Sequence, residues 1–232
     1  VSVSLKVGID AVIDKIVPND FVMSTSLNLD DENHNEISKP SNKAMDDELE
    51  IVKDKLKKLN VESKNERAYL IHNFEVNYNK KVQSLNFKTS GMNQYLNVIS
   101  AEQYQRYTGK KLSIDSNEAI SIGSSFDKKI NIAGKDFEIR NSNLKGLPSD
   151  ISPLFDEFTL VVKDEKTIEG FIEKAKATGH YKGTHLYFTA DFKKEPNLDF
   201  NKFNELLGDY MVEREKPMNL GMASIATRAE IN

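Results

Sequence analysis

Two histidines in the C-terminal half are the first candidates for chemistry, because imidazole is both a metal ligand and a proton acceptor near neutral pH. His180 and His185 are five residues apart, and Asp191 follows in the stretch THLYFTADF. Residues two apart in a strand share a face, so His185 and Asp191 are predicted to lie on one face. A metal site would need both imidazoles and the carboxylate to converge. The spacing favours histidines at the surface or at the core edge over such a cluster.

An acidic loop over residues 28–43, NLDDENHNEISKPSNK, is the other candidate site. Its oxygen-bearing residues from position 31 onward imitate the start of a calcium-binding loop. The sixth position of that motif requires Gly and is Glu36 here, and the twelfth requires Glu and is Asn42. We therefore interpret the segment as a solvated loop that attracts a cationic ligand, not a metal. Its candidate ligand-binding residues are Asp30, Asp31, Glu32 and Glu36.

Motifs for nucleotide or hydrolytic chemistry are missing from the sequence. Gly109-Lys110 and Gly134-Lys135 lack the upstream glycine of a phosphate-binding loop, so both glycines are interpreted as turn residues. There is no G-x-G-x-x-G, no nucleophile elbow and no H-E-x-x-H. The chain has no cysteine, which excludes thiol catalysis and Cys-ligated zinc. We expect neither catalytic residues nor a cofactor.

Composition indicates a globular chain of 232 residues, long enough to bury a core. Its formal charge of -4, from 36 acidic and 32 basic residues, is too mild to suggest nucleic acid as a partner. No apolar run approaches the roughly 18 residues that would span a bilayer.

Hydrophobic periodicity predicts the elements that position these residues. In the N-terminal half, helices are expected over 1–17 and 44–59, and strands over 20–27, 67–79 and 81–90. A short helix is expected after Ser100, with Ser100 and Gln103 as a capping box and Gly109 as a left-handed stop. Tyr104 and Tyr107 on that helix are interpreted as packing against the sheet, with a recognition surface as the alternative.

The C-terminal half is predicted to alternate hairpins with strand and helix units. Strands are expected over 119–123, 156–164 and 184–192, with a hairpin over 129–140 that turns at Ala133-Gly134. One helix carries Ile168, Phe171, Ile172 and Ala175 inward, and another follows over 200–211. The residues from MASIATRAEIN to the end are interpreted as helix-compatible.

These elements predict an α+β fold, with a mixed and mainly antiparallel sheet and helices packed on one of its faces. We expect a helix over 1–17, an α+β domain over 18–214, which divides into lobes over 18–97 and 98–214 in an alternative reading, and a further segment over 215–232. Neither end shows a helix stop, so both ends are interpreted as helix-compatible beyond the given residues.

The stretch NVISAEQYQRYTGKKLSIDSNEAISI resembles a segment of the extracellular domain of FtsX/MacB-like ABC transporter permeases of the bacitracin-resistance (BceB) type. Those domains show a strand, a short S-x-x-Y-N-x-x-x-G-K helix and an acidic residue before the next strand. The matching positions are Ser100, Tyr104, Gly109, Lys110 and Glu118. The departures are Gln105 in place of Asn and Tyr107 in place of an aliphatic residue. DEFTLVVKDEKTIEGF and ASIATRAE are also similar, the latter to a juxtamembrane helix.

The resemblance implies that the helix over 1–17 is membrane-proximal and that 215–232 is a membrane-proximal return segment. Both terminal helices would then lead to removed transmembrane segments. The resemblance also implies a function and a location. It implies an extracellular ligand-sensing domain at the cell membrane, belonging to a permease for resistance to cell-wall-directed antimicrobial peptides in Gram-positive bacteria. The implied ligand is a peptide antibiotic or its complex with a lipid precursor. The implied partners of the parent permease are a separate ATPase subunit and a sensor histidine kinase.

Two alternatives remain open. The resemblance also fits a protein-interaction arm of an FtsX-like permease, which activates a hydrolase or transports lipoproteins. The residues leave open a free-standing enzyme that uses residues such as His185 and Asp191.

Overall fold

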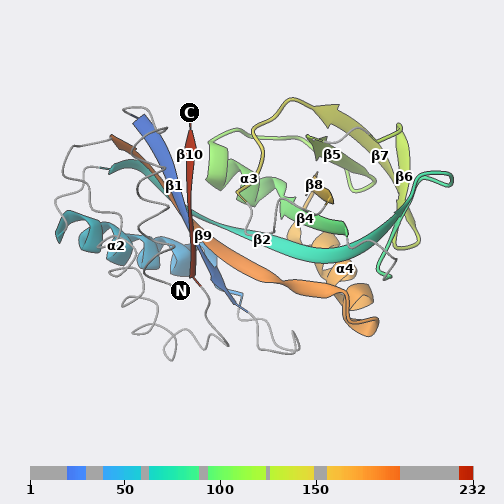
Figure 1. Cartoon of the computed structure of the whole chain (residues 1–232), viewed down its shortest axis with the longest axis horizontal. Coiled ribbons are helices and arrows are strands. Elements are labelled where there is room, and N and C mark those ends of the chain that lie inside the picture. The colour runs from blue at the N-terminus through green and yellow to red at the C-terminus, as the bar shows by residue number, and fades with distance from the viewer. Residues whose placement is uncertain are drawn as a thin grey trace, which may run out of the picture. The chain divides into compact units, whose positions relative to one another are not determined.

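The computed structural model describes residues 20–29, 39–58, 63–88, 94–123, 126–148, 156–193 and 225–231. The helices in this part of the chain are α2 (Asn42–Lys58), α3 (Ala101–Thr108) and α4 (Glu165–Ala177) (Figure 1). The strands are β1 (Asp20–Asn28), β2 (Ser63–Asn79), β3 (Ser84–Asn86), β4 (Gln94–Ser100), β5 (Glu118–Ile122), β6 (Lys129–Ile132), β7 (Lys135–Ser142), β8 (Asp156–Val162), β9 (Tyr181–Lys193) and β10 (Ile225–Ile231). None of these three helices combines the length and apolar composition needed to cross a bilayer.

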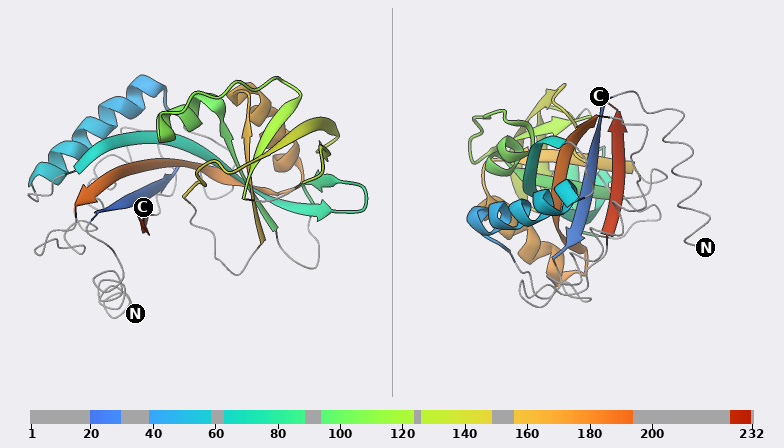
Figure 2. Two further views of the ribbon diagram at one scale, coloured as in Figure 1. Left: turned by 90° about the horizontal axis from the view of Figure 1, so that it is seen from above. Right: turned by 90° about the vertical axis from the view of Figure 1, so that its left-hand side faces the viewer.

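The strands form a mixed sheet. Antiparallel ladders connect β1 with β10, β2 with β3 and β4, β5 with β8, and β6 with β7. Parallel ladders connect β3 with β6, β4 with β8, and β5 with β7. The two long strands β2 and β9 are neighbours in the strand order and run side by side (Figures 1 and 2). The α+β class with a mixed sheet, expected from the sequence, is confirmed.

The chain divides into two compact units that are discontinuous in sequence. The first unit comprises Val1–Asn28, Ser38–Ala68 and Leu186–Asn232, and the second comprises Leu29–Ile37 and Tyr69–His185. The division falls inside β2 and β9, whereas the sequence suggested lobes that meet near residue 97.

In the first unit, α2 confirms the helix expected over 44–59 but starts two residues earlier. The Ser41 hydroxyl accepts a hydrogen bond from the Ala44 amide over 3.1 Å, which caps the helix. Met45, Val52 and Leu56 are buried along one stripe. Because α2 starts at Asn42, the acidic residues at 46–48 lie beyond its first turn.

The C-terminal segment corrects one prediction. Residues 225–231 form β10, antiparallel to β1, and not the juxtamembrane helix expected from ASIATRAE. The stretch contains the β-branched residues Ile225, Thr227 and Ile231, which favour a strand once a partner strand is available. That partner is some two hundred residues away, which is why local helix compatibility was misleading. The helices expected over 1–17 and 200–211 lie outside the described residues.

The core of the second unit lies between α4 and one face of the sheet. Phe74 of β2, Leu96 of β4 and Leu160 of β8 are fully buried there with Phe171 and Ile172 of α4. The predicted inward stripe of α4 is confirmed, since Ile168, Phe171, Ile172 and Ala175 are all buried. Four of the rings in this cluster are close neighbours, with centroid distances from Phe171 of 5.7 Å to Phe137 and 6.4 Å to both Phe74 and Phe87.

Helix α3 contacts the opposite face of the sheet. Tyr107 packs on Tyr69 in a tilted arrangement, with ring centroids 4.6 Å apart. Tyr69 and Phe74 differ by an odd number of positions on β2, so their side chains point to opposite faces. The helices therefore cover both faces, which corrects the expectation of helices on one face. The interpretation of Tyr104 and Tyr107 as packing residues is confirmed, because each is 1% exposed.

Candidate functional site

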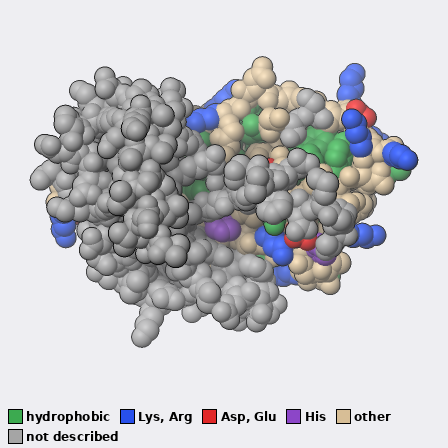
Figure 3. All heavy atoms as spheres, in the orientation of Figure 1, with side chains coloured by type: hydrophobic (Ala, Val, Ile, Leu, Met, Phe, Trp, Pro, Cys, Tyr) green, Lys and Arg blue, Asp and Glu red, His purple; other side chains and the backbone are tan. Residues whose placement is uncertain are grey.

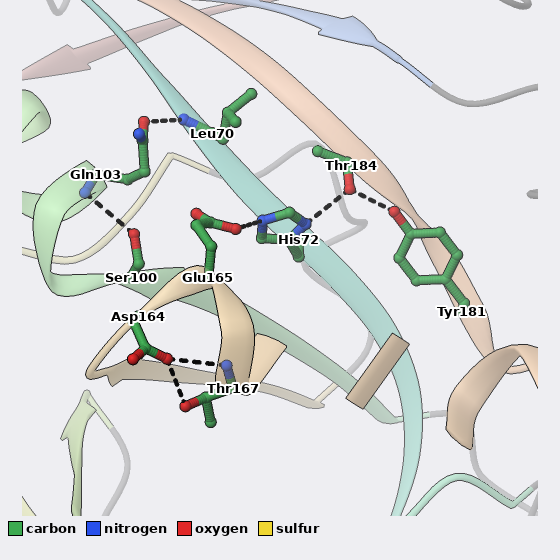
Figure 4. A network of polar contacts seen from close by, with 9 residues as sticks. All are labelled: Leu70, His72, Ser100, Gln103, Asp164, Glu165, Thr167, Tyr181 and Thr184. Carbon is green, nitrogen blue, oxygen red and sulfur yellow. Dashed lines mark hydrogen bonds and ion pairs between the residues drawn. The ribbon is translucent and has the colours of Figure 1, made fainter. Parts of the chain in front are cut away.

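A buried polar network centred on His72 of β2 is the first candidate site among the described residues of the second unit. The His72 side chain is fully buried. It is a polar ring within a run of buried apolar residues that includes Ile71 and Phe74. Its Nδ1 lies 2.7 Å from Oγ1 of Thr184 on β9, and its Nε2 lies 2.9 Å from Oε2 of Glu165 on α4 (Figure 4). One imidazole thus connects two strands and the first turn of a helix.

The strand β9 supplies two hydroxyls to this network because Gly183 interrupts its alternation. Tyr181 and Thr184 are three residues apart, which in a regular strand would put them on opposite faces. Gly183 has a φ of 116°, a conformation that other residues rarely adopt, and the two hydroxyl groups hydrogen-bond to each other. Local distortion at a glycine is a common way to redirect a strand side chain. The distortion at Gly183 therefore lets the contacts continue from Glu165 through His72 and Thr184 to Tyr181.

Both protonation states of His72 satisfy this geometry. In the neutral form, Nε2–H donates to the Glu165 carboxylate and Nδ1 accepts from the Thr184 hydroxyl. In the charged form both nitrogens donate, and Thr184 accepts while donating to Tyr181. The network therefore satisfies a ring whose exposed fraction is zero, which a buried polar group requires.

The order hydroxyl, imidazole, carboxylate is also the order of a nucleophile relay. Here the hydroxyl of Thr184 belongs to a residue that is 0% exposed and is already hydrogen-bonded to Tyr181. A nucleophile must have space about 3 Å away for a reacting atom. The arrangement instead positions α4 on the sheet, since Glu165 is the first residue of that helix.

The start of α4 is fixed by its N-cap, Asp164. One Asp164 carboxylate oxygen accepts from the Thr167 amide over 2.9 Å and from the Thr167 hydroxyl over 2.8 Å (Figure 4). These two hydrogen bonds hold the pKa of Asp164 below its usual value, and the one from the backbone amide has the larger effect. The cap sets the first turn, and with it the position of Glu165 next to His72.

We expect Asp164→Ala to lower the free energy of unfolding by about 1 kcal/mol at pH 7, as N-cap losses do. Because the folded pKa is depressed, the charged cap stabilises the fold above the unfolded pKa of about 3.9, and this contribution is lost as pH falls through the folded pKa. In urea unfolding, the difference in the free energy of unfolding between the wild-type chain and Asp164→Ala should therefore become smaller over that acidic pH range. Asp164→Asn, which retains the cap without the charge, should stay close to wild type and lose the pH dependence. An unchanged gap at low pH would contradict this account.

Helix α3 is tied to the same strand by side-chain hydrogen bonds. Ser100 accepts from the Gln103 amide over 3.2 Å, and the Gln103 side-chain oxygen accepts from the Leu70 amide of β2 over 2.9 Å (Figure 4). Gly109 ends the helix with a φ of 77°. Ser100 as cap and Gly109 as left-handed stop are therefore confirmed.

The two tyrosines of α3 anchor the loop that follows β7. The Tyr104 hydroxyl donates to the Lys145 carbonyl and the Tyr107 hydroxyl to the Gly146 carbonyl, both over 3.0 Å. Burial raises the pKa of Tyr104, so its hydroxyl stays a donor over the neutral range.

Of the two histidines singled out in the sequence, His185 lies on β9, and His180 contacts Thr178 and Glu75. His180 Nδ1 lies 3.0 Å from the Thr178 hydroxyl, and its Nε2 lies 3.6 Å from a Glu75 carboxylate oxygen. In the first unit, Asp191 accepts from Asn65 over 2.7 Å and pairs with Arg67 over 3.2 Å. Across the described ranges, no group of three His, Cys, Asp or Glu residues could hold a metal ion. Asp30, Asp31, Glu32 and Glu36 of the acidic loop lie outside the described residues.

Sequence reasoning missed His72, Glu165 and Thr184. Glu165 and Thr184 follow His72 by 93 and 112 positions, so no local spacing in the sequence connects the three residues. The one available signal was a histidine within the apolar run YLIHNFEV, since a polar residue inside a buried strand needs a partner.

In the space-filling view, lysine and arginine side chains are dispersed along the edge of the described surface, among other polar atoms (Figure 3). Hydrophobic side chains appear there only in small groups. Val82 is the only large hydrophobic residue exposed among those described, at 67%.

Comparison with known proteins gives distant structural similarities. No protein-family model matches the sequence, and no curated protein matches it. A solved chain described as a lipoprotein from Bacillus anthracis is 11% identical, with coverage of 89% of this chain and 97% of that chain and a TM-score of 0.38. Oligomeric Cmr4 from Pyrococcus furiosus is 10% identical, with coverage of 92% and 100% and a TM-score of 0.40. A domain described as part of a permease protein from Porphyromonas gingivalis is 10% identical, with coverage of 92% and 90% and a TM-score of 0.23. None of these similarities assigns an activity to the chain.

Proposed function

We propose that this chain is the extracellular ligand-sensing domain of an ABC transporter permease of the FtsX/MacB-like, bacitracin-resistance type. Its ligand is a cell-wall-directed peptide antibiotic, alone or bound to a lipid precursor. The parent permease passes the binding signal to its ATPase subunit and to a sensor histidine kinase. The family part of this proposal rests on the resemblance around Ser100, Tyr104, Gly109, Lys110 and Glu118.

The observation that carries the proposal is the pairing of the first and last described strands. Phe21 of β1 lies directly opposite Ile231 of β10 in an antiparallel ladder. Paired Cα atoms in such a ladder are about 5 Å apart, so the described chain starts and finishes at one place. This geometry suits a domain inserted between two neighbouring segments of a larger chain. A displacement of the first unit would reach both segments together through β1 and β10.

In this proposal the buried network around His72 has a structural role. Its hydroxyl and imidazole belong to residues that are 0% exposed, and the contacts they make hold α4 and β9 to β2. The ATP chemistry of such a transporter would belong to a separate subunit, in keeping with the lack of a phosphate-binding loop in the sequence. The formal charge of -4 suits a cationic peptide, mainly by raising its encounter rate.

Titration calorimetry with bacitracin and with nisin, each with and without undecaprenyl pyrophosphate and at two salt concentrations, tests the proposal. We expect saturable binding that weakens at the higher salt concentration, because screening reduces charge attraction. No binding of either peptide under any of these conditions would overturn the proposal. If a pull-down from cell-wall extract instead captured a hydrolase or a lipoprotein, the protein-interaction arm would replace it.

Deletion of residues 29–40 tests the acidic loop as the capture element. We expect the deletion to weaken peptide binding by about tenfold at low salt, since it removes Asp30, Asp31, Glu32 and Glu36 together. The same titration at high salt should show a smaller difference. Unchanged affinity at low salt would remove the loop from the binding site while leaving the proposed function standing.

A further inference from the structure

Two rows of polar or aromatic side chains cross three neighbouring strands of the second unit on one face of the sheet. Residues paired in register project to the same face, and so do residues two apart in one strand. The rows run from β2 through β4 to β8 and consist of Asn73, Asn97 and Thr159 in one, and Glu75, Tyr95 and Glu157 in the other. The alternate positions of the same strands, Phe74, Leu96 and Leu160 among them, are in the apolar core. On the polar face, Asn73 and Asn97 are only 5% and 1% exposed, so their side chains need hydrogen-bond partners.

The two asparagines form a directed chain of hydrogen bonds that ends on a carboxylate. The Asn97 side-chain amide donates to Oε1 of Glu157, and the Asn73 side-chain amide donates to Oδ1 of Asn97. An ionised carboxylate can only accept, so Glu157 fixes the orientation of the Asn97 amide. Asn97 in turn fixes the amide of Asn73. The remaining oxygen, Oδ1 of Asn73, is therefore an acceptor by necessity.

Oδ1 of Asn73 has no hydrogen-bond partner among the described residues, although Asn73 is only 5% exposed. A buried acceptor without a partner destabilises a fold, so a hydrogen-bond donor placed at this oxygen would be stabilising. Hydrogen bonds in series polarise one another, so the charge of Glu157 strengthens Asn73 as an acceptor. The donor that suits such an oxygen best carries a positive charge.

The other groups of the two rows point to the same ligand chemistry. Tyr95 lies between Glu75 and Glu157 in register, and a tyrosine ring attracts a cation placed over its face. Glu75 already has basic side chains beside it, since its carboxylate oxygens lie 3.6 Å from His180 Nε2 and 3.8 Å from Lys182 Nζ. Glu157 is half-buried and its one described contact is the neutral amide of Asn97, so its charge is available to a ligand.

We propose that Asn73, Tyr95, Asn97 and Glu157 form a binding site for a protonated amine or guanidinium group of a ligand. The cation donates to Oδ1 of Asn73, is attracted by Glu157 and lies against the ring of Tyr95. This inference rests on the proposed function and deepens it, because it identifies basic side chains as the part of the peptide that the second unit recognises.

Side-chain amide signals of the two asparagines test the site directly. We would titrate the ¹⁵N-labelled chain with N-acetyl-lysine amide, and with N-acetyl-norleucine amide as the uncharged probe of similar length. The lysine probe should shift the Asn73 and Asn97 side-chain signals to saturation, and the norleucine probe should not. Glu157→Gln, which keeps an acceptor for Asn97, should weaken binding by about tenfold, the difference between a charged and a neutral acceptor. Tyr95→Leu should weaken it by about threefold.

Glu173→Gln is the matched control, because Glu173 is an exposed carboxylate on α4. It should leave lysine binding unchanged, and backbone spectra of all three variants should retain the wild-type fold. Equal responses to the two probes, or full affinity in Glu157→Gln, would overturn the inference. If the lysine probe binds while bacitracin and nisin do not, the site stands and the proposed function fails. If the peptides bind without shifting Asn73 or Asn97, the proposed function stands and this site is wrong.

Discussion

Replacing His72 with alanine is expected to lower the free energy of unfolding by about 3 kcal/mol. The substitution removes a fully buried ring and leaves Thr184 and Glu165 without the partners that lie 2.7 and 2.9 Å away. Leaving a buried hydrogen-bonding group without its partner costs about 1–3 kcal/mol, and the substitution does so for two groups, of which the Glu165 side chain is 21% exposed. Urea unfolding followed by circular dichroism measures the change.

Substitutions at Thr184 provide the matched controls for this prediction. Thr184→Val keeps the volume but removes the hydroxyl between His72 and Tyr181, and should cost about 1–3 kcal/mol. Thr184→Ser keeps the hydroxyl and should cost about 1 kcal/mol or less. If Val and Ser were equally tolerated, or if His72→Ala cost under about 0.5 kcal/mol, the network would not hold these elements together.

Phe171→Ala in α4 is expected to cost about 3–5 kcal/mol, the usual range for removing a buried phenylalanine from a core. Phe171 is 4% exposed and its ring neighbours Phe74, Phe87 and Phe137. Rings on three separate strand or loop segments cannot all move inward to fill the space, so a cavity should remain. The same urea experiment measures the loss.

Glu173→Ala, two residues along the same helix and exposed, is the control for Phe171→Ala. It should change the free energy of unfolding by no more than about 0.5 kcal/mol. A comparable loss for both substitutions would mean that α4 is stabilised by its own turns and not by the aromatic core.

The elements that the sequence predicted well are those whose signals are local. Ser100 and Gly109 delimit α3, and Ala133-Gly134 turns the hairpin of β6 and β7 with φ values of 50° and 91°. Both features depend on residues within a few positions of each other. The spacing of Ile168, Phe171, Ile172 and Ala175 likewise identified the buried face of α4.

The elements that the sequence did not predict depend on distant partners. The strand β10 exists through pairing with β1, and local residues alone also permit a helix. The network at His72 requires β2, α4 and β9 to meet, and the contact of Tyr181 with Thr184 requires the glycine conformation at Gly183. The Asn73–Asn97–Glu157 chain depends on strand register, which a single sequence does not specify.

The most direct test of the central claim, that this chain binds a cationic peptide at the polar face of β2, β4 and β8, is hydrogen–deuterium exchange with and without bacitracin and nisin. The account predicts slower exchange at residues 73–76, 94–97 and 156–159 when peptide is bound, with no such change for a neutral peptide of the same length. Bound peptide that left exchange in these three segments unaltered, or a chain that showed no response to either antibiotic, would contradict it.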